Sequence, residues 1–116
     1  MAMHELSIAM SIVELAQEEA QNRGVRVLAV HLKLGPLAGV VSDALRGSFE
    51  MAAAGTALEH SRLVIQETSI VAFCPKCEDR RRVASMQWMR CPDCSAPVSE
   101  VLEGAELQVT GLEVEP

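Results

Sequence analysis

The sequence contains no tyrosine, and aromatic residues make up only 3% of its 116 residues. Apolar residues of all kinds nevertheless reach 49%. That fraction is enough for one compact domain with, at most, a small satellite module. The hydrophobic core must therefore be built from leucine, valine, isoleucine, alanine and methionine rather than from stacked rings.

Positive charge is also scarce. Ten lysines and arginines face sixteen acidic residues, so the formal net charge is −6, and the tail from residue 98 onward carries five glutamates and no basic residue. A general nucleic-acid binder needs a basic surface to contact phosphates. We therefore expect no nucleic-acid partner.

The chain lacks a long hydrophobic run and a basic start followed by an apolar stretch. We expect neither a membrane span nor a secretory signal. It also lacks a phosphate-binding glycine loop, a Ser/His/Asp pattern and any cysteine beyond the four discussed below. These absences argue against an enzyme and for a protein of the reducing cytoplasm.

The four cysteines form two matched pairs, Cys74-Pro75-Lys76-Cys77 and Cys91-Pro92-Asp93-Cys94, separated by thirteen residues. That separation leaves room for a short hairpin that brings both pairs onto one ion. Four thiolates satisfy the closed tetrahedral coordination of structural zinc. Two local disulfides or a redox pair are the alternatives, but a redox pair needs no second copy. The spacing predicts a zinc site with ligands Cys74, Cys77, Cys91 and Cys94.

Hydrophobic periodicity predicts helices alternating with strands. The expected helices cover 6–21, ended by Gly24, and about 42–54, and the expected strands cover 25–34, 63–73 and 106–115, with part of a ribbon hairpin at 83–89. The first helix should bury Met10 among other apolar residues, and Ser42 should cap the second. The alternation in the last strand slips at Gly111, which suggests a bulge.

The terminal strand needs a partner that the zinc ribbon is too small to supply. We therefore expect it to return to the main sheet. The zinc module, residues 74–97, would then be an insertion between two strands of one α/β domain made of residues 1–73 and 98–116.

Three histidines remain as sources of further chemistry. His31 lies on an expected strand and His60 in a loop, and both are expected to be solvent-exposed or hydrogen-bonded structural residues. His4 instead lies near the start of the sequence, followed by Glu5. An amine, backbone amidates and an imidazole in adjacent positions make a planar nitrogen set that favours Ni(II) or Cu(II) over Zn(II). The alternative is that Glu5 only complements the helix dipole.

Several of these features occur together in one known family. Met3-His4-Glu5-Leu6-Ser7-Ile8, the helix that follows, the strand ending Leu34-Gly35, the paired knuckles and the closing Gly104-Ala105-Glu106-Leu107 resemble the HypA/HybF proteins. The resemblance covers nearly the whole chain. Zinc knuckles alone are generic, but their combination with the Met-His-Glu opening is specific.

The resemblance implies an α+β fold with a small mixed three-stranded sheet, two helices and a zinc-ribbon module. It implies a nickel metallochaperone that works with a HypB-type GTPase and delivers Ni(II) to the precursor of the [NiFe] hydrogenase large subunit. The nickel ligands would be His4, with Glu5 as ligand or support. The resemblance leaves homodimer formation open.

The sequence departs from the family pattern in two places. Met1-Ala2 precedes the motif, and the acid that family members place at the entry to the second helix is replaced by Val40-Val41-Ser42, with Asp43 nearest. An accessory role for Asp43 is therefore doubtful.

The extension at the start decides which backbone groups can bind nickel. If the mature chain starts at Met3, the donors are the Met3 amine, the His4 amide and imidazole, and a group from Glu5. If it starts at Ala2, the Ala2 amine, two amidates and the imidazole complete a planar set without Glu5. If Met1 stays, this tight chelate is degraded.

A rival interpretation is a zinc-ribbon interaction module that binds protein or nucleic acid and has no nickel function. Its support is the basic run Arg80-Arg81-Arg82, which is more often a solvated turn. A hydrolytic or redox enzyme is a weaker rival, because four cysteines close the zinc coordination.

Overall fold

The computed structural model describes residues 2–116, with side chains from His4 onward. It divides into two compact units. Unit 1 contains the segment ending at Leu32, together with Val40–Gln66 and Gln108–Pro116; unit 2 contains Lys33–Gly39 and Glu67–Leu107. The expected limits of two independent domains, 1–73 with 98–116 and 74–97, stay a prediction.

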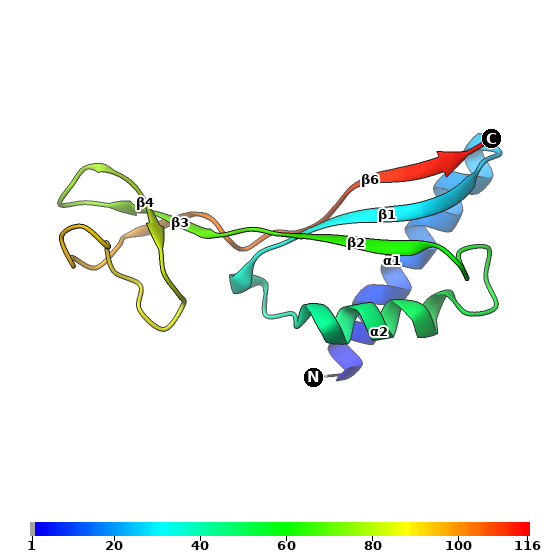
Figure 1. The fold of residues 1–116 in the computed structure, drawn as a ribbon, viewed down its shortest axis with the longest axis horizontal. Coiled ribbons are helices and arrows are strands. Elements are labelled where there is room, and N and C mark those ends of the chain that lie inside the picture. The colour runs from blue at the N-terminus through cyan, green and yellow to red at the C-terminus, as the bar shows by residue number, and fades with distance from the viewer. Residues whose placement is uncertain (1) are drawn as a thin grey trace. The chain divides into compact units, whose positions relative to one another are not determined.

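Unit 1 is built on a three-stranded sheet with the order β2-β1-β6. The strands are β1 (Arg26–Leu34), β2 (Arg62–Glu67) and β6 (Leu107–Glu115). β1 and β2 run in the same direction and β6 runs in the opposite one, so the sheet is mixed (Figure 1). The predicted return of the terminal strand to the main sheet is confirmed.

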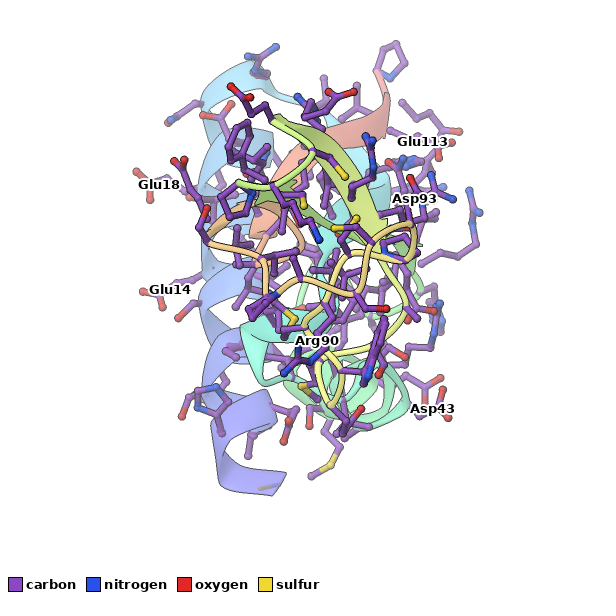
Figure 2. All side chains as sticks on the ribbon, turned by 90° about the vertical axis from the view of Figure 1, so that its left-hand side faces the viewer. Glu14, Glu18, Asp43, Arg90, Asp93 and Glu113 are labelled. Atoms are coloured by element: carbon purple, nitrogen blue, oxygen red, sulfur yellow. The ribbon has the colours of Figure 1, made fainter. Side chains whose placement is uncertain are left out.

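Helix α1 covers Ala2–Arg23 and is longer than predicted at both ends. Its buried apolar face consists of Ala9, Ile12, Val13, Ala16 and Ala20. The prediction that Met10 belongs to the core is wrong, since its side chain is 57% exposed. Glu14 and Glu18 project outward from the opposite side of the helix (Figure 2).

The end of α1 follows from Gly24. Gly24 has a positive φ of 63°, and the Val25 amide donates to the Ala20 carbonyl at 3.1 Å. A left-handed residue just after the last turn is the usual way to satisfy the final carbonyls of a helix, and glycine adopts it without steric cost. The predicted role of Gly24 as helix terminator is confirmed.

Helix α2 (Ser42–Ala53) packs against α1, and both helices lie on the same side of the sheet (Figure 1). It buries Leu45, Phe49 and Ala53, as its periodicity predicts. Its N-cap is Val41, and no side chain caps it, so the prediction that Ser42 caps the helix is wrong. The Val41 amide instead donates a hydrogen bond to Glu5 of α1, which is described with the candidate site below.

The core of unit 1 contains aliphatic side chains from both helices and the sheet, with Phe49 as its one fully buried ring. Val109 and Leu112 of β6 both pack against this core. Residues three apart on one strand share a face only if the alternation slips between them. This packing agrees with the slip expected at Gly111, and a bulge at that residue stays a prediction.

Unit 2 contains the second sheet, which has the order β4-β3-β5 and is antiparallel throughout. Its strands are β3 (Ile70–Cys74), β4 (Asp79–Val83) and β5 (Glu100–Glu103). Its core is small, with Ile70, Ala72 and Val83 fully buried. The predicted strand at 63–73 is split between β2 and β3. The segment 83–89, predicted to form part of a ribbon hairpin, holds the last residue of β4 and an isolated antiparallel bridge between Ser85 and Trp88.

Unit 2 also holds a close crossing of two backbone segments. Gly35 precedes a short 3₁₀ helix, η1 (Pro36–Ala38), and donates its amide to the Glu106 carbonyl at 2.8 Å. A Cβ atom added at Gly35 would lie only 2.2 Å from the carbonyl oxygen of Gly104. Nearby, the Glu106 carboxylate accepts hydrogen bonds from the Thr68 hydroxyl at 2.7 Å and from the Gly104 amide at 3.1 Å. One acidic side chain thus joins two chain segments around the glycine crossing.

Candidate metal centres

The four cysteines meet at one point of unit 2. Their sulfur atoms all lie within 4.8 Å of one another. The Sγ atoms of Cys74 and Cys94 are 3.5 Å apart, and those of Cys77 and Cys91 are 3.9 Å apart. A tetrahedron with Zn–S bonds of about 2.3 Å has edges of roughly 3.8 Å. The two separations bracket that value, so the sulfur cage has the size that a zinc ion requires.

The two knuckles have the same backbone conformation. The Glu78 amide donates to the Cys74 carbonyl at 2.8 Å, and the Ser95 amide donates to the Cys91 carbonyl at 2.9 Å. Glu78 and Ser95 both adopt positive φ angles, 55° and 64°. Left-handed backbone at non-glycine residues is uncommon. Its repetition at equivalent positions shows that each knuckle closes in the same way and presents its sulfurs inward.

Arg81 links the surroundings of the two knuckles. Its Nη1 lies 3.1 Å from Oδ2 of Asp79, just after the first knuckle, and its Nε lies 2.8 Å from Oδ2 of Asp93, inside the second. The Arg81 side chain is only 24% exposed. The hydrogen bond with Asp79, followed by the charges of Asp93 and Cys77, raises the pKa of Arg81. A fixed positive charge at this place offsets the negative charge of a zinc tetrathiolate.

The thiol pKa values show how crowded the cage is. Hydrogen bonds with Cys94 and Cys74 raise the pKa of Cys77 to about 12. Burial also raises the pKa of Cys91, but backbone amides of Cys94 and Asp93 more than offset it and lower the pKa to about 7. Four neighbouring thiols cannot all ionise without a compensating cation. A bound metal ion would supply that cation, and a set of four thiolates suits zinc, which would fix four chain positions around one point.

His4 and Glu5 lie in the first turns of α1 but face different surroundings. His4 is exposed, whereas the Glu5 side chain is only 1% exposed. The Glu5 carboxylate accepts a hydrogen bond from the Val41 amide at 3.3 Å. This bond lowers the pKa of Glu5 below its ordinary value, although burial opposes the shift. Glu5 is therefore a buried, ionised contact between α1 and the entry to α2.

The backbone at Ala2 and Met3, which the sequence offered as metal donors, belongs to the first turn of α1. Their side chains and the whole of Met1 lie outside the described residues. Within the part of the chain that is described, only the four cysteines gather as three or more metal-binding side chains.

The other residues that the sequence singled out lie apart from this turn or serve other contacts. Asp43 is exposed on the first turn of α2 (Figure 2). His31 lies with its Nε2 atom 2.5 Å from Oε2 of Glu113 on β6, so the prediction of a hydrogen-bonded structural histidine is confirmed. His60 is exposed in the loop before β2.

Sequence reasoning missed two contributors to these sites. Arg81 was grouped with its neighbours as one basic run, although Asp79 and Asp93 beside the knuckles were a signal that one arginine would turn toward the metal. Val41 acts through its backbone amide, 36 residues from Glu5. A backbone contact of that kind leaves no trace in residue type.

Comparison with known proteins decides the family. The profile described as "Hydrogenase/urease nickel incorporation, metallochaperone, hypA" matches residues 3–114. The chain belongs to the HypA family. It is 47% identical to the hydrogenase maturation factor HypA of Chloroflexus aurantiacus over 112 residues, covering 96% of this chain and 98% of that protein. It is 42% identical to the HypA of Geobacter metallireducens, covering 97% and 100% of the two chains.

Solved structures of the HypA family share the fold. The solution structure of the Ni metallochaperone HypA from Helicobacter pylori matches with a TM-score of 0.63 at 18% identity, covering 95% of this chain and 96% of that one. A second solution structure of a HypA protein matches with a TM-score of 0.71 at 20% identity, covering 97% of each chain. The α+β fold of the HypA family, with two helices, a mixed three-stranded sheet and a separate sheet carrying four cysteines, is therefore confirmed.

Membership fixes the general function. HypA proteins are nickel metallochaperones of hydrogenase maturation, and they are not enzymes. The rival interpretations as a zinc-ribbon module without nickel function and as an enzyme are therefore set aside. No helix among the described residues is long and apolar enough to cross a membrane.

Proposed function

We propose that this HypA-family chain binds Ni(II) at His4, holds a structural Zn(II) at its four cysteines, and passes the nickel to the precursor of a [NiFe] hydrogenase large subunit. The observation that carries the proposal is the position of His4, an exposed imidazole in the first turn of a long helix. A delivery site must be reachable by the acceptor, and an imidazole at the exposed end of α1 meets that need.

The start of α1 also supplies backbone nitrogen. The first amides of an α-helix have no carbonyl four residues earlier to receive them. Deprotonating the amide of His4 for a metal therefore breaks no hydrogen bond of the helix. The positive end of the helix dipole disfavours a bound cation. Amidate donors and the nearby Glu5 carboxylate offset that effect.

Glu5 is better placed to support this turn than to bind nickel. Its carboxylate is buried and committed to the Val41 amide. This contact ties the first helix to the segment entering α2 and so restricts where the His4 backbone can move. We therefore assign nickel ligation to His4 and backbone nitrogen, and a supporting role to Glu5.

The two metals are kept apart by ligand chemistry. A closed tetrahedral set of four thiolates suits zinc, whereas planar nitrogen donors suit Ni(II). Protonation of the nitrogen donors releases a metal held in this way. The zinc is thus a permanent part of unit 2, and the nickel is cargo.

The partners that this function needs are a HypB-type GTPase and the hydrogenase large-subunit precursor, in the cytoplasm where the precursor is made. The match to the hydrogenase nickel-incorporation family supports partners of this kind. A homodimer is compatible with the same function.

A maturation assay tests delivery. In cells that contain a [NiFe] hydrogenase but lack their own HypA, the parent chain should restore hydrogenase activity at low nickel. His4→Ala should not restore it, and His60→Ala, which removes an exposed histidine elsewhere, should behave like the parent. Full activity with His4→Ala would refute the assignment of nickel delivery to His4.

Two substitutions at Glu5 distinguish a residue that holds the first turn of α1 in place from one that binds nickel directly. Glu5→Gln keeps an acceptor oxygen for the Val41 amide but removes the anionic donor, whereas Glu5→Ala removes both. We expect Glu5→Gln to retain most nickel affinity and Glu5→Ala to lose both affinity and thermal stability. A loss of nickel affinity in Glu5→Gln as large as that in His4→Ala would make Glu5 a ligand.

The intact mass of the purified protein shows whether the first residue is Met1, Ala2 or Met3.

A further inference from the structure

The only tryptophan of the chain lies on the surface of unit 2. Trp88 is 44% exposed, and Met86 beside it is 54% exposed. An isolated β-bridge joins Ser85 and Trp88, and the Trp88 amide donates to the Ser85 carbonyl at 3.2 Å. Met89, the next residue, packs against the small core instead. The turn therefore directs a smaller apolar side chain inward and leaves the indole outside.

The neighbouring basic run is not uniform. Arg80 pairs with Glu103, and Arg81 pairs with Asp79 and Asp93. Arg82 is exposed, and no ion pair to it occurs among the described residues. Of the three arginines that follow the first knuckle, Arg82 thus keeps its positive charge available to a partner.

Arg82 and Met86 line the same groove. The groove has a volume of about 550 Å³ and lies within unit 2. Its other walls include Pro36, Gln87 and Pro92. The arrangement combines an apolar hollow, one available guanidinium and an exposed indole on the adjoining turn. We call this set, Arg82, Met86, Trp88 and the groove, the Trp88 surface.

We propose that the Trp88 surface is a docking site for an acidic, extended segment of a partner protein. An apolar side chain of that segment would occupy the groove beside Met86, a carboxylate would pair with Arg82, and the chain on either side would reach the indole of Trp88 on the adjoining turn. Tryptophan and arginine are the residue types that most often dominate binding energy at protein interfaces, and methionine is also enriched there. A guanidinium next to an apolar hollow selects a carboxylate through a charge-assisted hydrogen bond.

Charge complementarity favours an acidic peptide over a nucleic acid. Nucleic-acid binding needs several cations aligned along a backbone, whereas two of the three consecutive arginines are already neutralised by carboxylates. One available arginine beside apolar groups fits a peptide with one or two carboxylates around an apolar anchor.

Trp88 makes the test direct because it is the sole tryptophan. The zinc-loaded full chain would be titrated with a synthetic peptide in which glutamates flank one leucine, while tryptophan emission is recorded. We expect a saturable blue shift, reduced by added salt. A peptide with glutamine in place of glutamate should bind on the order of tenfold more weakly, as expected for loss of a charge-assisted hydrogen bond.

Variants locate the binding on the surface. Arg82→Glu, and the milder Arg82→Gln, should weaken binding of the acidic peptide on the order of tenfold or more. Arg26→Glu makes the same charge change on β1 of unit 1 and serves as the matched control. Zinc content and circular dichroism show that each variant is folded. His4→Ala should bind the peptide like the parent, so this proposal and the nickel proposal can fail separately.

Several outcomes would overturn the proposal. They are the absence of a shift at millimolar peptide, equal binding by folded Arg82 variants, and an equal response to a lysine-containing peptide. A stronger, salt-dependent response to oligothymidylate would make the surface a nucleic-acid site instead. Self-association in sedimentation that disappears in Trp88→Ala would make its occupant a second copy of the chain.

Discussion

Gly35 shows how a single residue can be required by the backbone of another segment. Its φ of −98° is open to any residue, so conformational freedom does not explain the glycine. The Gly104 carbonyl carbon and oxygen lie 2.3 and 2.2 Å from where a Cβ would be. Backbone atoms cannot move aside as a flexible side chain can. The need for glycine therefore comes from packing.

Gly35→Ala should destabilise unit 2 by about 2–3 kcal/mol, because overpacking against backbone forces the crossing segments apart. The matched change Gly47→Ala, in the middle of α2 where nothing lies within 4 Å of the added Cβ, should stabilise unit 1 by about 1 kcal/mol. Urea unfolding of both variants with zinc bound checks the contrast. If Gly35→Ala were as stable as the parent, the close approach of the Gly35 and Gly104 backbones would be contradicted.

The pKa of a second single residue, Glu113, leads us to expect that the stability of unit 1 depends on pH in acid. The hydrogen bond with His31 lowers the pKa of Glu113 below its ordinary value of 4.5, with Arg62 adding to the effect. A carboxyl group with a lowered folded-state pKa stabilises the fold above its ordinary pKa and loses that contribution as pH falls through the lowered value. The effect is small because the side chain is 46% exposed.

The parent should therefore lose more thermal stability below pH 4.5 than Glu113→Gln does. Far-UV circular dichroism reports on unit 1, since both α-helices lie there. Parallel pH profiles for the two proteins would contradict the role of this pair.

At the scale of elements, the zinc knuckles and the strand between them act together through Arg81. Its guanidinium contacts Asp79 after the first knuckle and Asp93 within the second. Groups that surround metal ligands commonly change metal affinity when they are removed. Arg80, one residue away, pairs with Glu103 on β5 instead.

Arg81→Gln should weaken zinc binding on the order of tenfold, because the tetrathiolate loses a nearby positive charge and both aspartates lose their partner. Arg80→Gln, which removes the same charge from the neighbouring position, should leave zinc affinity close to that of the parent. Competition with a chromophoric chelator measures both. A loss of the same size in Arg80→Gln would point to net charge rather than to the Arg81 contacts.

Some elements could be predicted from the sequence because their signals are local. The spacing of the cysteines correctly predicted that their four sulfur atoms meet at one point. The spacing of apolar residues in α1 predicted most of its buried face, with Met10 as an error. The split between β2 and β3 was missed although four polar residues, 66–69, interrupt the apolar run. The break is fixed by distant partners, because Thr68 donates its amide to the Leu34 carbonyl and its hydroxyl to the Glu106 carboxylate. β5 escaped notice because all four of its residues are exposed. The Glu5–Val41 contact was hidden because it joins distant segments through backbone.

At the scale of the whole molecule, stability is divided unevenly between the units. Unit 1 has an aliphatic core drawn from two helices and a sheet. The core cluster of unit 2 has only three buried residues, Ile70, Ala72 and Val83. A core of that size does not hold a fold by itself, so we expect a metal ion bound by the four cysteines to supply the difference.

Removing zinc with a strong chelator should therefore unfold unit 2 and leave unit 1 folded. Hydrogen exchange should show loss of amide protection in β3, β4 and β5, and retention in α1 and α2. Readdition of zinc should restore protection. Simultaneous loss in both units would show that zinc holds the entire chain rather than unit 2.

The central claim, that His4 holds the nickel, is tested most directly by a Ni(II) titration of the zinc-loaded protein. Its comparison partners are His4→Ala and His60→Ala. We expect about one nickel per chain for the parent and for His60→Ala, with the planar-site absorption typical of nitrogen donors, and loss of most affinity in His4→Ala. Equal binding by His4→Ala would place the nickel elsewhere and contradict its assignment to His4.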